Sequence, residues 1–247
     1  MTTTAKRGSS RQVATQHVHF LLDESGSMGV LQASAIEAYN AYVDELAKGK
    51  TASRIKFSLT TFDSTAIRRR VAEETIKDVP KLDFDTYVPN AGTPLYDAVG
   101  RVIDWLDREV KKGETVMVSI FTDGMENASR AYDRAAIFEK IQARQGKDWT
   151  FTYMGSNQDA WLVASSIGIP MGNAATFTST PDDVSNAYRV MAELHSEHLA
   201  GDSSSTQAMY SRLTDSTGHI RGDSRSTPEP EPPHKEENPT DAEDAWA

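Results

Sequence analysis

Three short polar clusters in the sequence carry side chains that could bind a metal ion. The first, DESGS, contains Asp23, Ser25 and Ser27. The second, NAGTPLYD, contains Thr93, and the third, TDG, contains Asp123. Two carboxylates and three hydroxyls form a set of hard oxygen donors, which suits Mg²⁺ or Mn²⁺. These groups cannot fill an octahedron without water, so we expect an open coordination position.

Each cluster alone also has a simpler structural explanation. Serine, aspartate and glycine are common in turns, so DESGS could be an ordinary loop. Thr93 followed by Pro94 fits the N-cap of a helix, and TDG is a frequent ending of a strand. The joint occurrence of the three clusters, each at the end of a predicted strand or the start of a predicted helix, favours a metal site.

The segments between these clusters alternate between strand-like and helix-like patterns. Short apolar or alternating runs predict strands at residues 17–22, 55–62, 66–71, 115–121, 150–154 and 174–177. Apolar stripes and capping residues, among them Thr180, predict helices at residues 30–46, 94–112, 129–144, 158–167 and 181–199. The alternation predicts an α/β fold with a mostly parallel sheet, one antiparallel edge strand and helices on both faces.

In a sheet of this kind, ligands bind beyond the carboxyl ends of the strands, where the strand order reverses. DESGS and TDG directly follow predicted strands, and Thr93 precedes a predicted helix. We therefore expect the three clusters to meet at one edge of the sheet.

The clusters and their surroundings resemble the metal-ion-dependent adhesion site (MIDAS) of the von Willebrand factor A (vWA) domain. The resemblance rests on Asp23-x-Ser25-x-Ser27 after an apolar strand, on the Tyr-x-Pro-x-x-Gly-Thr-Pro-Leu-Tyr-Asp-Ala run around Thr93, and on Phe-Thr-Asp-Gly ending in the turn at Asp123. The resemblance covers roughly residues 17 to 200. Within the family, the chain is similar to intracellular members from bacteria or phages.

The resemblance implies a Rossmann-like vWA fold and a role for each of the five residues. Ser25, Ser27 and Thr93 would offer hydroxyl oxygens to the ion, and Asp23 and Asp123 would bind it directly or through water. The vacant position would take a carboxylate from an Asp or Glu of a protein partner. Many bacterial domains of this type resemble adaptors for larger assemblies, including AAA+ ATPase machines.

The charge is distributed unevenly along the 247 residues, whose formal net charge is −10. Residues 201–247 contain ten acidic and four basic residues, a net charge of −6, together with five of the ten prolines. We interpret residues 1–15 as a flexible basic N-terminus, residues 16–200 as the vWA domain, and residues 201–247 as an acidic, Pro-rich disordered tail. The tail carboxylates are themselves candidate ligands for the metal site.

Composition excludes several classes of protein. Without cysteine the chain has no disulfide, thiolate zinc site or thiol nucleophile. The acidic balance argues against nucleic acid and against anionic membranes as partners. No apolar run reaches the length of a spanning helix and no signal peptide is evident, so we expect a soluble cytoplasmic protein.

Other polar residues have weaker claims to a functional role. Asp63 and Glu126 could support the metal from behind, but a hairpin turn and a helix start explain them equally well. His195 and His198 fit a solvated helix face better than a metal clamp. Further residues have simple structural explanations: helix capping for Asn157 and Asp159, a core or edge position for His17 and His19, and an exposed sheet edge for Arg68 to Arg70.

These features lead to one main functional expectation and two alternatives. The main one is a binding module without enzymatic activity, in which the metal captures an acidic residue of a protein partner. The first alternative is a Mg²⁺-dependent hydrolase or phosphoryl-transfer enzyme, against which stands the absence of a GxxxxGK[ST] loop and of a general base near the clusters. The second is a structural protein with an idle metal.

Overall fold

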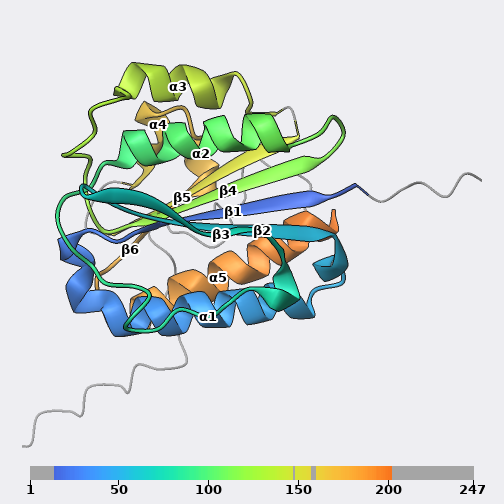
Figure 1. Ribbon diagram of the computed structural model, residues 1–247, viewed down its shortest axis with the longest axis horizontal. Coiled ribbons are helices and arrows are strands. Elements are labelled where there is room, and N and C mark those ends of the chain that lie inside the picture. The colour runs from blue at the N-terminus through green and yellow to red at the C-terminus, as the bar shows by residue number, and fades with distance from the viewer. Residues whose placement is uncertain (1–13, 147, 157–159, 202–247) are drawn as a thin grey trace, which may run out of the picture.

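The computed structural model describes residues 14–146, 148–156 and 160–201, which build a six-stranded sheet with helices on both faces (Figure 1). The strand order is β3-β2-β1-β4-β5-β6. The strands are β1 Gln16–Asp23, β2 Ile55–Asp63, β3 Ala66–Thr75, β4 Thr115–Thr122, β5 Trp149–Ser156 and β6 Ala174–Phe177. Only the β2–β3 pair is antiparallel, so the predicted α/β class with one antiparallel edge strand is confirmed.

Five α-helices cover the sheet in two layers (Figure 1). Helices α1 Gln32–Lys48 and α5 Pro181–Ala200 lie on one face. Helices α2 Leu95–Glu109, α3 Arg134–Gln142 and α4 Ala160–Ser166 lie on the other. Short 3-10 helices at Gly26–Leu31, Ala52–Arg54, Ile76–Asp78 and Met171–Asn173 complete the described part of the chain.

The face covered by α1 and α5 is held by a cluster of aromatic side chains. Phe20 of β1 contacts the rings of Tyr39 and Tyr42 from α1 and of Tyr188 from α5, with centroid distances of 5.2 to 5.7 Å. Such large buried rings contribute much of the burial that stabilises a small domain. Packing from both sides fixes β1, the central strand that ends at Asp23.

The strand predictions agree with the structure within a few residues, and the helix predictions differ at three starts. Residues 26–31 form a 3-10 turn before α1, and α3 begins at Arg134 after Asp133, whose carboxylate accepts a hydrogen bond from the Ala136 amide. Helix α2 begins at Leu95. The last helix begins as predicted, with the Thr180 side chain accepting a hydrogen bond from the Asp183 amide.

One prediction about a surface residue is wrong. His195 does not lie on a solvated helix face: it is buried, and its Nδ1 lies 2.8 Å from the hydroxyl of Tyr42 in α1. The arginines of β3 lie on the edge strand, as predicted, and they also have acidic partners within the chain. Arg69 forms an ion pair with Glu109 of α2, and Arg68 and Arg70 contact Glu24.

Residues 1–13 and 202–247 lie outside the described residues, as do Asn157 and Asp159, so the predictions made for them stay predictions. His17 and His19 are buried, as predicted. No helix in the part of the chain that the structure describes is long and apolar enough to cross a membrane.

Candidate metal centre

The candidate ligands meet where the strand order reverses. From β1 the sheet continues to β2 on one side and to β4 on the other, and all three strands are parallel. Strand β1 ends at Asp23, and Asp123 follows the last residue of its neighbour β4. The two carboxylates of the predicted site therefore lie at the same edge of the sheet, the one formed by the carboxyl ends of the parallel strands, as expected.

Asp23 is fully buried and is held by neutral partners. Its Oδ1 accepts a hydrogen bond from the Ser25 amide at 2.8 Å, and its Oδ2 accepts one from the Thr122 hydroxyl at 2.5 Å. Burial raises the pKa of Asp23 to about 6, although these hydrogen bonds act in the opposite direction. The nearby Asp123 adds a smaller repulsion that also raises this pKa.

Ser25, Ser27 and Asp123 form a chain of oxygen atoms. The hydroxyls of Ser25 and Ser27 lie 3.2 Å apart, and the Ser27 hydroxyl donates to Oδ1 of Asp123 at 2.6 Å. Asp123 is half-buried, and burial raises the pKa of its carboxyl group. The two ends of the sequence motif are thus joined across 96 residues.

Thr93 completes the set, and Gly124 identifies its position. A Cβ atom added to Gly124 would lie 2.8 Å from Oγ1 of Thr93 and 3.5 Å from Oδ2 of Asp23, so these two oxygen atoms approach the same backbone position. Thr93 is held through its backbone by Asn127, whose Oδ1 accepts from the Thr93 amide at 2.8 Å. The predicted N-cap role is wrong, because Pro94 precedes the first turn of α2 and no side-chain cap is present there.

The electrostatics of the site fit a divalent cation. Both aspartates are partly or fully buried and both pKa values are raised, while the hydrogen-bond partners of the two carboxylates are hydroxyls and amides. Carboxylates that are removed from water without a cation carry an uncompensated desolvation cost. Since no group of three acidic or histidine side chains within the described ranges could hold an ion, any metal here must use the hydroxyls as well.

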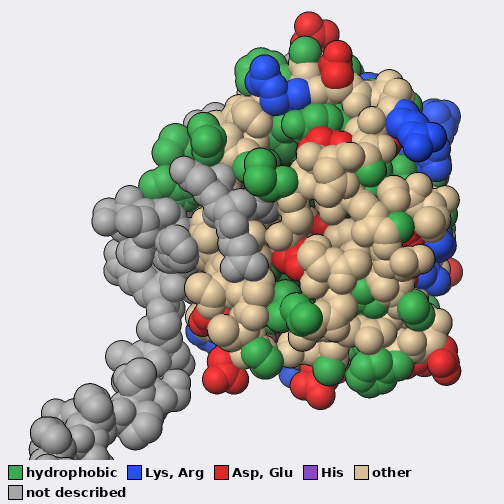
Figure 2. Space-filling model, turned by 90° about the vertical axis from the view of Figure 1, so that its left-hand side faces the viewer, with side chains coloured by type: hydrophobic (Ala, Val, Ile, Leu, Met, Phe, Trp, Pro, Cys, Tyr) green, Lys and Arg blue, Asp and Glu red, His purple; other side chains and the backbone are tan. Residues whose placement is uncertain are grey.

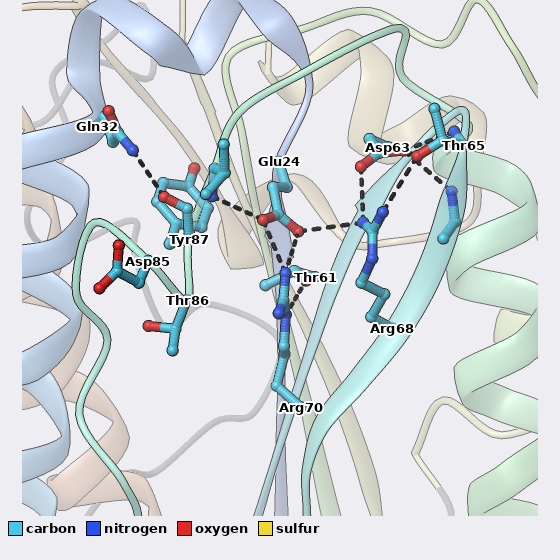
Figure 3. A network of polar contacts seen from close by, with 12 residues as sticks. Glu24, Gln32, Thr61, Asp63, Thr65, Arg68, Arg70, Asp85, Thr86 and Tyr87 are labelled. Carbon is cyan, nitrogen blue, oxygen red and sulfur yellow. Dashed lines mark hydrogen bonds and ion pairs between the residues drawn. The ribbon is translucent and has the colours of Figure 1, made fainter.

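Glu24 was missed by the sequence interpretation, although it lies between two candidate ligands (Figure 3). Its side chain is 2% exposed and accepts hydrogen bonds from Nη2 of Arg70 at 2.9 and 3.0 Å and from the Val88 amide at 2.8 Å. The three consecutive arginines of β3 were the available signal, because acidic residues of the same chain can pair with such a basic run. Glu24 therefore ties the DESGS loop to the β2–β3 hairpin and to the loop that carries Thr93.

Further backbone contacts hold the same loops together. The Tyr87 hydroxyl donates to the carbonyl oxygen of Asp23 at 2.6 Å, and the Asn90 amide donates to the carbonyl oxygen of Glu24 at 2.8 Å. The Gly26 amide donates to the carbonyl oxygen of Ala91 at 3.0 Å. The loop before Thr93 is thus attached to the end of β1 at three points.

Asp63 and Glu126 have the structural roles that were considered for them. Asp63 accepts hydrogen bonds from the amides of Thr65 and Ala66 and pairs with Arg68, so it organises the hairpin turn. Glu126 accepts hydrogen bonds from the amide of Ser129 at 2.7 Å and from the amide of Tyr96, in the first turn of α2, at 3.0 Å. Among the described residues, the hydrogen-bond partners of both carboxylates are other residues than the candidate ligands.

Comparison with solved structures finds the same architecture at low sequence identity. The pilus adhesin SpaC from Lactobacillus rhamnosus GG, in its open conformation, matches with a TM-score of 0.61 and 11% identity, over 76% of this chain and 31% of that chain. The vWF domain of the type V pili tip protein Mfa5 from Porphyromonas gingivalis matches with a TM-score of 0.53 and 12% identity, over 75% of this chain and 96% of that chain.

A third match is a structure of similar fold in which the MIDAS motif is occupied by zinc. Proximal thread matrix protein 1 from the mussel byssus, with a zinc-occupied MIDAS motif, matches with a TM-score of 0.51 and 13% identity, over 74% of this chain and 46% of that chain. This chain thus spans less than half the length of that protein and about a third of SpaC. No protein-family model and no curated protein matches the sequence.

At these identities the comparisons show the fold alone, and that fold is shared with the vWF domain of Mfa5. The order of the strands, the antiparallel edge and the two helical layers agree with that assignment. The chain therefore has the Rossmann-like fold of the von Willebrand factor A domain.

Proposed function

We propose that this chain is a divalent-metal-dependent binding module that captures an Asp or Glu side chain of a protein partner. The ion would be held by Asp23, Ser25, Ser27, Thr93 and Asp123. One observation carries the proposal: two carboxylates with raised pKa values and three hydroxyls from three separate loops converge at one edge of the sheet, surrounded by neutral partners.

The donor set favours a reversible interaction with an acid. Two carboxylates balance the formal charge of a divalent ion, but the other three ligands are neutral hydroxyls. The ion therefore keeps enough positive character to attract a further oxygen ligand. A partner carboxylate that joins such an ion in a partly dry site gains more than the 0 to about 1 kcal/mol of a surface ion pair. Mg²⁺ and Mn²⁺ are the proposed ions, since both prefer hard oxygen ligands; the zinc-occupied MIDAS of the mussel protein supports divalent binding in this fold.

The adaptor role and the cellular location belong to the same proposal. We include in it a cytoplasmic location and an assembly with an AAA+ ATPase, as the resemblance to intracellular members of the family implies. The similar structures include a pilus adhesin, a pilus tip protein and a byssus protein, and this chain covers only part of two of them, so their partners do not carry over.

Isothermal titration with Mg²⁺ and Mn²⁺ tests the metal site. The Ser25→Ala/Ser27→Ala double variant should bind either ion at least ten times more weakly than the unchanged protein. Ser185→Ala removes an exposed hydroxyl from α5 and serves as the matched control, with unchanged affinity expected. Equal metal affinity in all three proteins would contradict the site.

Affinity purification tests capture of a partner. Proteins retained in Mg²⁺ should be lost in EDTA and should be absent from the Asp123→Ala variant.

A screen with phosphate esters and nucleotides in Mg²⁺ tests the enzymatic alternative. Turnover that disappears in Asp23→Ala would replace the binding module with a hydrolase.

A further inference from the structure

Three exposed apolar residues lie close in the chain to the candidate ligands, one on each of the three segments that supply them. Val30 is 84% exposed and follows Ser27 by three residues, and Met125 is 67% exposed and follows Asp123 by two. Val88 is 53% exposed, and its amide donates to Glu24 beside Asp23. We call these three residues the apolar rim.

Figure 2 looks onto this face, with acidic side chains near its middle and hydrophobic side chains around them. Single exposed apolar residues are common, but three loops that converge on one polar site and each expose one are typical of a binding surface. The chemistry that fits is a carboxylate for the ion together with an apolar or aromatic side chain for the rim.

The chain contains one acidic segment with that chemistry outside the described residues. Between residues 202 and 247 the only aromatic residues are Tyr210 and Trp246, and only Trp246 has carboxylates within three residues, in the run Asp241-Ala-Glu-Asp-Ala-Trp246. The other acidic runs of this region, around Glu229 and Glu236, lack an aromatic neighbour. Large aromatic side chains are the usual anchors of protein interfaces.

The segment can reach the site from the place where the described chain ends. Helix α5 ends beside the start of β1, where Nε2 of Gln16 donates to the carbonyl oxygen of Leu199 at 2.7 Å. From there to Asp23 the distance is about that of an eight-residue strand, roughly 26 Å. The 40 residues from Gly201 to Asp241 can span at most about 130 Å, so their length permits the contact.

We infer that the segment Asp241–Trp246 binds the metal face of its own chain, with an acidic side chain on the ion and Trp246 on the apolar rim. This inference rests on the proposed function and names its first ligand. The consequence is competition, because an attached segment with a Kd of about 100 µM, at an effective concentration of about 1 mM, weakens the binding of a free ligand about tenfold.

The test uses the full chain and a fluorescein-labelled peptide of residues 239–247 as the free ligand. A tail-neutral variant, Asp241→Asn/Glu243→Gln/Asp244→Asn, removes the attached carboxylates. Fluorescence anisotropy should show the peptide binding about ten times more tightly to this variant than to the unchanged chain in Mg²⁺, and not in EDTA. Equal affinity for the two proteins would overturn the inference.

Two matched comparisons test the rim. In the tail-neutral background, Val88→Ser/Met125→Ser should weaken the peptide at least fivefold, whereas Leu162→Ser, which alters a 68% exposed apolar residue on α4, should not. A peptide of residues 227–238, which is acidic but has no aromatic residue, should bind at least tenfold more weakly. Equal effects of the rim and Leu162 substitutions, or equal affinity of the two peptides, would overturn the inference.

Titration of the same variants with Mg²⁺ tests the metal site separately from the binding of the tail segment. If the ion binds and the peptide does not, the tail inference is wrong and the proposed function stands. If the ion does not bind, the proposed function is wrong as well.

Discussion

The Asp23 carboxylate occupies an unfavourable position for a negative charge in the metal-free protein. It is buried, its direct partners are a hydroxyl and an amide, and Asp123 lies nearby. Because the folded pKa of about 6 exceeds the ordinary value of 3.8, the neutral form stabilises the fold below about pH 4. This stabilisation is lost as the pH rises through about 6.

The substitution Asp23→Asn should therefore separate stability from metal binding. Asparagine keeps the shape and an oxygen acceptor but carries no charge, so the metal-free variant at pH 7.5 should be more stable by about 1–3 kcal/mol. Urea unfolding in EDTA measures the gain, and Mg²⁺ titration of the same sample should detect no binding. A variant that is less stable than the unchanged protein, or that binds Mg²⁺ normally, would contradict this assignment.

Gly124 is the second residue at which a small change tests the geometry. A methyl group there would lie 2.8 Å from the Thr93 hydroxyl oxygen, closer than real Cβ atoms approach, so Gly124→Ala must displace Thr93 or its own loop. We expect at least a tenfold loss of Mg²⁺ affinity and a stability change of about 1 kcal/mol or less, because Gly124 is only half-buried.

Gly29→Ala is the matched control for this prediction. Gly29 belongs to the 3-10 turn after Ser27, and a Cβ atom there would meet nothing within 4 Å. Its metal affinity should equal that of the unchanged protein, as measured by the same titration. Similar losses in both variants would mean that the glycines act through general loop flexibility rather than through the Thr93 contact.

At the scale of elements, the β2–β3 hairpin acts as a support for the metal loop. Glu24 accepts hydrogen bonds from Arg70 and lies 3.5 Å from Arg68, and its backbone amide donates to the carbonyl oxygen of Phe62 in β2. The same carboxylate receives the Val88 amide from the loop that leads to Thr93. One buried side chain thus fixes the relative positions of three segments (Figure 3).

Glu24→Gln should weaken both the fold and the site. Removing one partner of a buried ion pair costs about 3 kcal/mol, reduced here to about 2 because Arg70 is partly exposed. We expect this loss in urea unfolding, together with weaker Mg²⁺ binding, since the DESGS loop loses its anchor. The double variant Glu24→Gln/Arg70→Gln should regain part of the stability.

Glu109→Gln provides the control at the same hairpin. This substitution breaks the ion pair between Arg69 and Glu109 of α2, which lies away from the candidate ligands. The Glu109 side chain is more exposed than that of Glu24. This variant should lose some stability and keep its Mg²⁺ affinity. Loss of metal binding in both variants would show that the hairpin matters for folding in general, and not for the position of the metal loop.

The sequence predicted the elements well because their signals are local. The alternation at residues 55–62, the apolar stripe of α2 and the Thr180 cap depend on neighbours within one or two turns. The contacts that hold the site are distant: Arg70 lies 46 residues from Glu24, and Asn127 lies 34 residues from Thr93. Polar partners at such separations leave no periodic pattern, so the motif identified the candidate ligands but not the residues that position them.

At the scale of the whole molecule, the buried histidines make stability depend on pH. Burial lowers the pKa of His19 and of His195 to about 3, with smaller contributions from Arg69 and His198 respectively. His19 belongs to β1, and its Nε2 contacts the hydroxyl of Thr60 in β2 at 2.8 Å, whereas His195 joins α5 to α1 through Tyr42. Both core layers therefore contain a histidine that must be neutral in the folded state.

The sign of the pH effect follows from these two groups. In the unfolded chain each histidine takes up a proton near its ordinary pKa of 6.5, whereas in the folded protein it does so only near 3. Stability is therefore complete above about pH 6.5 and falls as the pH decreases towards 3. Asp23, whose folded pKa is about 6, and Asp123, whose pKa burial also raises, act in the opposite direction, whereas His198, whose pKa burial lowers, acts in the same direction as the two fully buried histidines.

We therefore expect the metal-free protein to lose about 2–3 kcal/mol of unfolding free energy between pH 7 and pH 5. Urea unfolding in EDTA at the two pH values measures the loss. His195→Gln removes one titrating group, so its stability, although lower at pH 7 after losing a buried side chain, should decrease by about 2 kcal/mol less over the same interval. An unchanged slope in this variant would contradict the assignment, because it would mean that burial between α1 and α5 does not keep His195 neutral while the unfolded chain takes up a proton.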